Sequence, residues 1–123
     1  FDLAAAEAVL TLRAAHSDVR LVAVVPFRGQ EERFSPADRV RFLRAVAAAD
    51  EVEVLAGGYR RGCYAVRNDF LVDRAALVVA WYDGSPGGTR YTLRRALARG
   101  REVWNLHPSG GGLAIRPVQP ALF

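Results

Sequence analysis

The sequence has no lysine and no methionine, and Cys63 is its single cysteine. One cysteine cannot form a disulfide within the chain, so we expect a reducing compartment. No apolar run approaches the roughly 20 residues that a membrane-spanning helix needs, and no segment has the pattern of a secretion signal. These absences predict a cytoplasmic protein with no membrane partner.

Metal-binding patterns are also missing. Neither His16 nor His107 lies at ligand spacing from other histidines, cysteines or carboxylates. We therefore expect no metal and no other cofactor. For the same reason no Ser/His/Asp or Cys/His arrangement can be assembled from spacing. Cys63 lies on an apolar stripe and is interpreted as a buried filler, and His107 is a weak acid–base candidate at the end of a strand.

The 17 basic side chains are all arginines and outnumber the 13 acidic ones, which gives a net charge of +4 and a pI of about 10.0. This balance favours anionic partners. It does not choose between a small phosphate ligand and nucleic acid. Because arginine- and alanine-rich composition is typical of GC-rich coding, a single arginine is weak evidence for a site.

Short apolar runs alternate with helical patterns along the chain. Four nearly continuous runs predict strands buried on both faces of a parallel sheet: Leu21–Val25, Val52–Leu55, Leu77–Trp81 and Val103–Leu106. Each is preceded by a helical stripe, and these stripes contain Leu3 to Leu10, Val40 to Val46, Cys63 to Phe70 and Leu93 to Leu97. Ser35 and Pro36 predict one helix start and Gly100 one helix end. The order αβαβαβαβ predicts a Rossmann-like α/β fold, an open parallel sheet with helices on both faces.

The two ends of the chain differ from this pattern. The first helical stripe begins almost at Phe1, without a methionine. We therefore expect a parent protein longer at its N-terminus by at least one βα unit, on the order of 30 residues. We expect residues 1–108 to form the domain. Residues 109–123 form a Gly/Pro-containing tail, with a flexible break at Ser109–Gly112 and then an edge strand or interaction tail.

A glycine-rich loop follows the third predicted strand. In open α/β sheets, ligands bind beyond the carboxyl ends of the strands. There, Gly87 and Gly88 let the backbone approach a phosphate, and a helix opening at Thr89 offers free N–H groups. A tight turn with Thr89 as helix N-cap would give the same local pattern.

Three other segments supply candidate binding residues. Arg67 and Asn68 lie midway along the preceding helix, where arginine can hold phosphate or carboxylate. On local pattern alone, a solvated helix face is the better explanation for them in so arginine-rich a chain. Pro26 and Gln30 follow the first strand, and Tyr59 follows the second, where its ring can stack on a base. Ordinary surface loops are the alternative for these segments. Asp73, near the end of its helix, is interpreted as structural.

Taken in order, these segments resemble the YpsA-like branch of the SLOG superfamily, which includes the LOG phosphoribohydrolases and the DNA-processing protein DprA. The features that carry the resemblance are Val25-Pro26-Phe27 with Gln30, Arg67-Asn68, Asp83-Gly84 and Gly87-Gly88-Thr89. The resemblance covers nearly all of residues 1–108. It implies a Rossmann-like fold, frequent dimerisation, and a site for a nucleotide or an ADP-ribose-like ligand.

One departure from this resemblance bears on catalysis. LOG enzymes carry a catalytic glutamate shortly after their Gly-rich loop, whereas Thr89 is followed here by Arg90, Tyr91 and Thr92. Hydrolysis of an N-glycosidic bond needs a placed acid or base. Our leading hypothesis is therefore binding or sensing of a phosphate-bearing nucleotide-type ligand. A nucleotide-processing hydrolase is the alternative. A DprA-like single-stranded DNA binder ranks third, because the basic residues are scattered and no row of aromatic residues interleaves with them.

We predict a homodimer, chiefly from the resemblance. Phe70, Leu71 and Tyr91 lie on predicted helices that can pack across a two-fold axis. Light scattering at micromolar concentration should give twice the mass of one chain. A monomeric mass would contradict the prediction.

Overall fold

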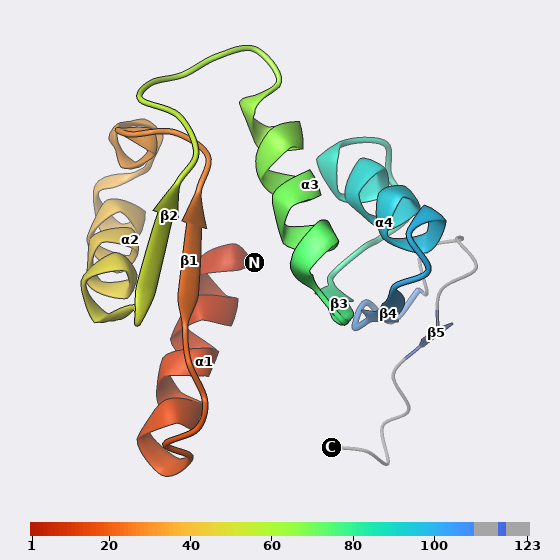
Figure 1. Ribbon diagram of the computed structural model, residues 1–123, viewed down its shortest axis with the longest axis horizontal. Coiled ribbons are helices and arrows are strands. Elements are labelled where there is room, and N and C mark those ends of the chain that lie inside the picture. Colours follow the sequence, from red (N-terminus) through yellow and green to blue (C-terminus); the bar gives the residue numbers. More distant parts are fainter. Residues whose placement is uncertain (110–115, 118–123) are drawn as a thin grey trace. The chain divides into compact units, whose positions relative to one another are not determined.

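The computed structural model describes residues 1–109 and 116–117 of the chain, drawn in colour in Figure 1. The chain divides into two compact units, Phe1–Cys63 and Tyr64–Phe123. Within the described residues no helix is both long and apolar enough to cross a membrane.

The first unit alternates helices with two parallel strands. It contains α1 (Asp2–Ala15), β1 (Val22–Val25), a 3-10 helix η1 (Gln30–Arg33), α2 (Pro36–Ala48) and β2 (Glu51–Val54). The strands pair in parallel from Val22 opposite Glu51 to Val25 opposite Val54. The predicted start of α2 is confirmed, because the Asp38 N–H donates to Ser35 Oγ at 3.2 Å and Pro36 is the first helical residue.

The carboxylate of Asp50 connects separate elements of this unit. Asp50 Oδ2 accepts the Leu21 N–H at the start of β1 (2.7 Å) and a bond from Arg13 Nη1 on α1 (2.9 Å). The Leu21 N–H and then Arg13 hold the pKa of Asp50 below its usual value. Arg13 also donates to the Ala48 carbonyl at the end of α2 (2.8 Å), so one side chain joins α1 to the α2–β2 turn.

The second unit repeats the pattern. Its elements are α3 (Cys63–Arg74, whose first residue falls in the first unit), β3 (Leu77–Ala80), α4 (Gly88–Ala98), β4 (Glu102–Asn105) and β5 (Arg116–Pro117). The strands β3 and β4 pair in parallel from Leu77 opposite Glu102 to Ala80 opposite Asn105. The strand β5 pairs in parallel with β4. Of the two expected alternatives for the tail, an edge strand and an interaction tail, Arg116 and Pro117 thus form an edge strand. The predicted break at Gly110–Gly112 lies outside the described residues.

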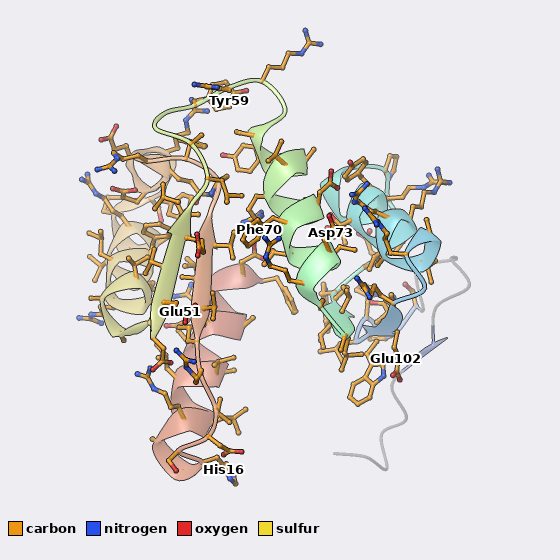
Figure 2. All side chains as sticks on the ribbon, in the orientation of Figure 1. His16, Glu51, Tyr59, Phe70, Asp73 and Glu102 are labelled. Atoms are coloured by element: carbon orange, nitrogen blue, oxygen red, sulfur yellow. The ribbon has the colours of Figure 1, made fainter. Side chains whose placement is uncertain are left out.

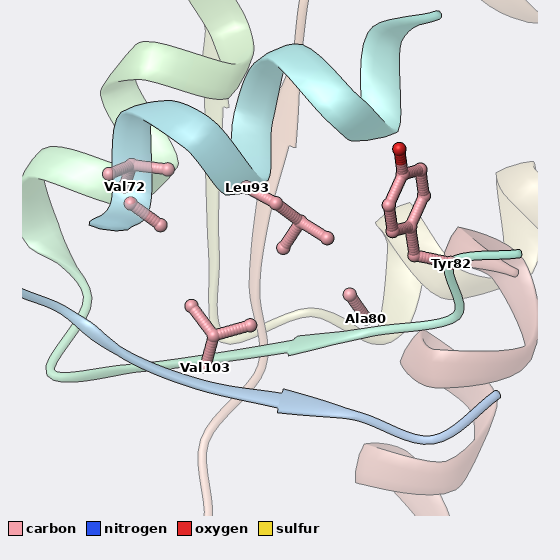
Figure 3. Close-up of a cluster of buried hydrophobic side chains, with 6 residues drawn as sticks. Val72, Ala80, Tyr82, Leu93 and Val103 are labelled. Atoms are coloured by element: carbon pink, nitrogen blue, oxygen red, sulfur yellow. The ribbon is translucent and has the colours of Figure 1, made fainter. Parts of the chain in front are cut away.

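The core of the second unit lies between the helices and one face of its sheet (Figure 3). Val72 from α3 and Leu93 and Ala96 from α4 pack with side chains of the strands and the loop after β3, namely Ala80, Tyr82 and Val103. On β3, Leu77 and Val79 alternate with these and are exposed. The side chains of β2 are exposed too. Each unit by itself therefore leaves these strand residues exposed, and burial of the strands on both faces remains a prediction.

The α/β class and the parallel pairing are confirmed, with the four predicted helices and four predicted strands at nearly the expected positions. Gly100 ends α4 with a left-handed φ of 69°. The helix η1 was not expected. One continuous Rossmann-like sheet with helices on both faces, and a single domain over residues 1–108, remain predictions.

Asn105 joins the carboxyl ends of β3 and β4. It is 2 % exposed. Its amide Nδ2 donates to the Tyr82 carbonyl (2.9 Å), and its Oδ1 accepts the N–H groups of Tyr82 (2.9 Å) and His107 (3.1 Å). One buried side chain thus satisfies three backbone groups that no strand partner reaches.

We predict that Asn105→Ala destabilises the protein by about 2–4 kcal/mol, because it leaves buried backbone groups without partners. Urea unfolding would measure the change. The matched control Glu53→Ala, at an exposed strand position, should change stability by less than about 0.5 kcal/mol. Equal effects of the two substitutions would contradict the role of Asn105.

Candidate functional site

The first turn of α4 lies in an exposed part of the predicted phosphate loop. The helix begins at Gly88, and its N-cap Gly87 has a φ of 141° with no side-chain cap. Thr89 is therefore the second helical residue, and the alternative in which Thr89 caps the helix is wrong. Because the first N–H groups of a helix have no acceptor within the helix, the uncapped end offers them to a ligand.

Space around this turn is open. Gly87, Gly88 and Thr89 are exposed, and a Cβ added at Gly87 or Gly88 would meet nothing within 4 Å. Glycine is needed at Gly87, because its φ is one that other residues rarely adopt. At Gly88 packing does not require glycine, because an added Cβ would meet open space.

An ionised carboxylate lies just before this loop. Asp83 Oδ1 accepts bonds from Ser85 Oγ (2.6 Å) and from the Ser85 N–H (2.9 Å). The Ser85 hydroxyl, then its N–H, and more weakly the charge of His107, hold the pKa of Asp83 below its ordinary value of 3.8. The side chain is therefore negative at neutral pH. It can accept hydrogen bonds from hydroxyl groups but repels the negative charge of a phosphate.

His107 follows β4, at the same carboxyl ends of the strands as Asp83. Its ring packs against Trp81 edge-to-face at 4.9 Å, and its Nδ1 lies 2.8 Å from Ser109 Oγ. Sequence spacing did not reveal that Asp83 and His107 interact. The order of the predicted elements did indicate it, because Asp83 and His107 each follow one of two strands that pair in parallel.

Arg67 and Asn68 form a pair on α3, where Arg67 Nε donates to Asn68 Oδ1 at 2.8 Å and both side chains are half-buried. The α3–α4 contacts join residues 22 apart, Asp69 with Tyr91 and Asp73 with Arg95. By the same offset, Arg67 is level with Thr89. Two residues along a helix correspond to about 200° of rotation, so Arg67 lies on the flank of α3 opposite Asp69.

The remaining predicted residues gather in the first unit. The Arg28 N–H donates to the Ala56 carbonyl at 3.0 Å, which brings the loops after β1 and β2 together. Tyr59, labelled in the loop after β2 in Figure 2, packs edge-to-face on Phe27 at 5.5 Å. The Arg33 guanidinium lies 4.3 Å from the Tyr59 ring centre. This cluster forms an aromatic surface with a cation on it.

The candidate residues of the first unit differ in how exposed their side chains are. Pro26 is fully buried, so its ring supports the loop and offers no surface to a ligand. Gln30 is half-buried at the start of η1, whereas Tyr59 is 54 % exposed. Pro26, Gln30 and Tyr59 belong to the first unit and the other candidates to the second. Their assembly into one site remains a prediction. Cys63 is buried, as expected of a filler.

Comparisons of the sequence with a family model and with known proteins agree on one family. A model of the YspA SLOG family (YpsA) matches residues 1–105. The chain is 29% identical over 121 residues to the uncharacterized SPbeta prophage-derived protein YoqJ of Bacillus subtilis, covering 87% of this chain and 71% of that protein.

Two further relatives are longer than the matched region. A UPF0398 protein of Halalkalibacterium halodurans is 31% identical over 101 residues, which cover 80% of this chain and 53% of that protein. A UPF0398 protein of Bacillus cereus is 27% identical over 109 residues, which cover 86% of this chain and 59% of that protein. The chain thus spans between half and three fifths of these two relatives.

We predict that Ser85→Ala raises the pKa of Asp83 toward 3.8, because the largest stabilising donor to the carboxylate is lost. Stability from this group is complete above pH 3.8 and falls as the pH drops through the lowered pKa. Carboxyl NMR titration would measure the pKa, with Ser17→Ala as the control that leaves it unchanged. An Asp83 pKa that is the same in both variants would refute the assignment.

Proposed function

The chain belongs to the YspA SLOG family, and from this premise we propose that it binds a phosphate-bearing nucleotide or nucleotide-derived ligand at the start of α4. Family membership suggests a nucleotide-related function in general. The observation that carries the proposal is the uncapped, exposed first turn of α4 with open space at Gly88. N–H groups directed at an anion, together with the positive end of the helix dipole, form a ready phosphate site.

The charges around this turn suggest how the ligand is oriented. The ionised Asp83 disfavours a phosphate in its immediate vicinity and favours hydroxyl donors, as an acidic residue does toward a ribose in dinucleotide-binding folds. A nucleotide offers both groups on one molecule. We therefore propose that the phosphate lies on the α4 turn and that the ribose faces Asp83.

Arg67 is proposed as a further contact for an extended ligand of the ADP-ribose type. Its hydrogen bond to Asn68 holds the guanidinium in place, which reduces the entropy lost on binding. Because Arg67 lies on the far flank of α3, it can serve a ligand that crosses the ends of both helices. It is poorly placed to serve a free phosphate on α4.

A second candidate function is hydrolysis of a glycosidic or phosphate bond in such a ligand. The observation in its favour is that Asp83 and His107, a carboxylate and an imidazole, follow two neighbouring parallel strands and that the charge of His107 contributes to lowering the pKa of Asp83. Such a pair can supply acid–base chemistry without the LOG glutamate. Release of base or ribose phosphate from AMP or ADP-ribose, lost in Asp83→Asn, would establish this function over binding alone.

We predict that Gly88→Leu weakens binding of AMP and ADP-ribose by at least about tenfold, because the side chain occupies the space above the helix N–H groups. The protein should remain folded, since leucine favours helices and the space at Gly88 is open. Arg67→Ala should weaken ADP-ribose binding by about one to two powers of ten. Calorimetric titration would measure both affinities.

The control for added bulk is Ala47→Leu, an exposed position on α2. It should leave both affinities unchanged. If wild type binds a nucleotide tightly and Gly88→Leu and Arg67→Ala bind it equally well, the site lies elsewhere.

A further inference from the structure

A depression of about 500 Å³ runs along one side of α4. Its lining residues share one stripe of the helix: Gly87, Arg90, Tyr91, Arg94, Arg95 and Ala98. It starts at Gly87, so it is continuous with the first turn of the helix. Three of the six lining residues are arginines.

Not all of these arginines are available to a ligand. Arg95 Nε lies 2.9 Å from Asp69 Oδ1 as an ion pair, although the N–H is not directed for a hydrogen bond. Asp73, labelled on α3 in Figure 2, pairs with Arg95 (3.4 Å) and with Arg99 (3.3 Å). Arg95 and Arg99 are therefore neutralised by α3, as expected of a structural Asp73.

Arg90 and Arg94 have no such partner in residues 1–109. The Nε atom of Arg90 is buried without a hydrogen-bond acceptor, and Arg94 is exposed without an ion pair. A cationic side chain without a carboxylate partner is stabilised by an anion beside its guanidinium group, so Arg90 and Arg94 suit an anion that enters the depression. Because helical side chains lean toward the N-terminus, both guanidinium groups are carried toward Gly87.

Tyr91 lines the same depression beside Arg90 and Arg94. Its hydroxyl donates to Asp69 at 3.0 Å, which fixes the ring, and the side chain is 44 % exposed. A fixed, half-exposed ring beside two cations is suited to contact a phosphate-bearing molecule along its length.

We propose that Arg90 and Arg94 form a second phosphate subsite, so that the preferred ligand is a nucleoside diphosphate and not a monophosphate. This proposal rests on the proposed function for the first phosphate, which lies on the α4 turn. The second phosphate is joined to the first through one bridging oxygen, so it lies beside the α4 turn, where the guanidinium groups of Arg90 and Arg94 can bind it.

The experiment compares ADP with AMP by calorimetric titration. Wild type should bind ADP about tenfold or more tightly than AMP. The double variant Arg90→Gln/Arg94→Gln should abolish this preference and leave AMP affinity within about threefold. The control Arg39→Gln, an exposed arginine on α2, should retain the preference. Gly88→Leu should weaken both nucleotides, which separates failure of the first site from failure of the second.

A direct readout covers the case in which the nucleotides do not bind. Inorganic pyrophosphate at millimolar concentration should shift the Arg90 Nε–H NMR signal, which is assigned by its loss in Arg90→Gln. The proposal is overturned if wild type binds ADP and AMP equally, if the double variant keeps the preference, or if pyrophosphate leaves that signal unmoved. Salt-dependent binding of single-stranded DNA without a preference for ADP would also overturn it.

Discussion

The buried amide of Asn105 links the carboxyl ends of β3 and β4, and the proposed site depends on that link. Tyr82 is held through both its N–H and its carbonyl, so the chain leaves β3 in one direction toward Asp83 and the α4 turn. The same Oδ1 holds the His107 N–H. Because the backbone is held at this point, the loop, the start of α4 and the imidazole of His107 are all positioned at the carboxyl ends of β3 and β4.

Charge is separated along this edge. Asp83 is negative next to the loop, while the helix start and the two unpaired arginines of α4 are positive. A ligand with hydroxyls at one end and phosphates at the other matches this separation.

The α3–α4 ion pairs explain why so arginine-rich a helix can lie against its neighbour. Asp69 and Asp73 take up Arg95 and Arg99, and Tyr91 is fixed by the same carboxylate as Arg95. Pairs at the protein surface contribute little to stability individually. Here they also divide the arginines at α4 into two groups: Arg95 and Arg99 are paired with α3, whereas Arg90 and Arg94 have no ion-pair partner among residues 1–109.

The sequence by itself determined the helices, the strands and their parallel class, since apolar periodicity and caps such as Ser35 are set by neighbours a few residues apart. It also located the Gly-rich loop, although it misjudged Thr89 as a possible cap. Only the tertiary structure decided that Asn105 is a buried bridge, that Asp83 is influenced by His107, and which arginines are paired. Those contacts join residues more than 20 positions apart, and their partners depend on strand register and helix facing, which local pattern does not encode.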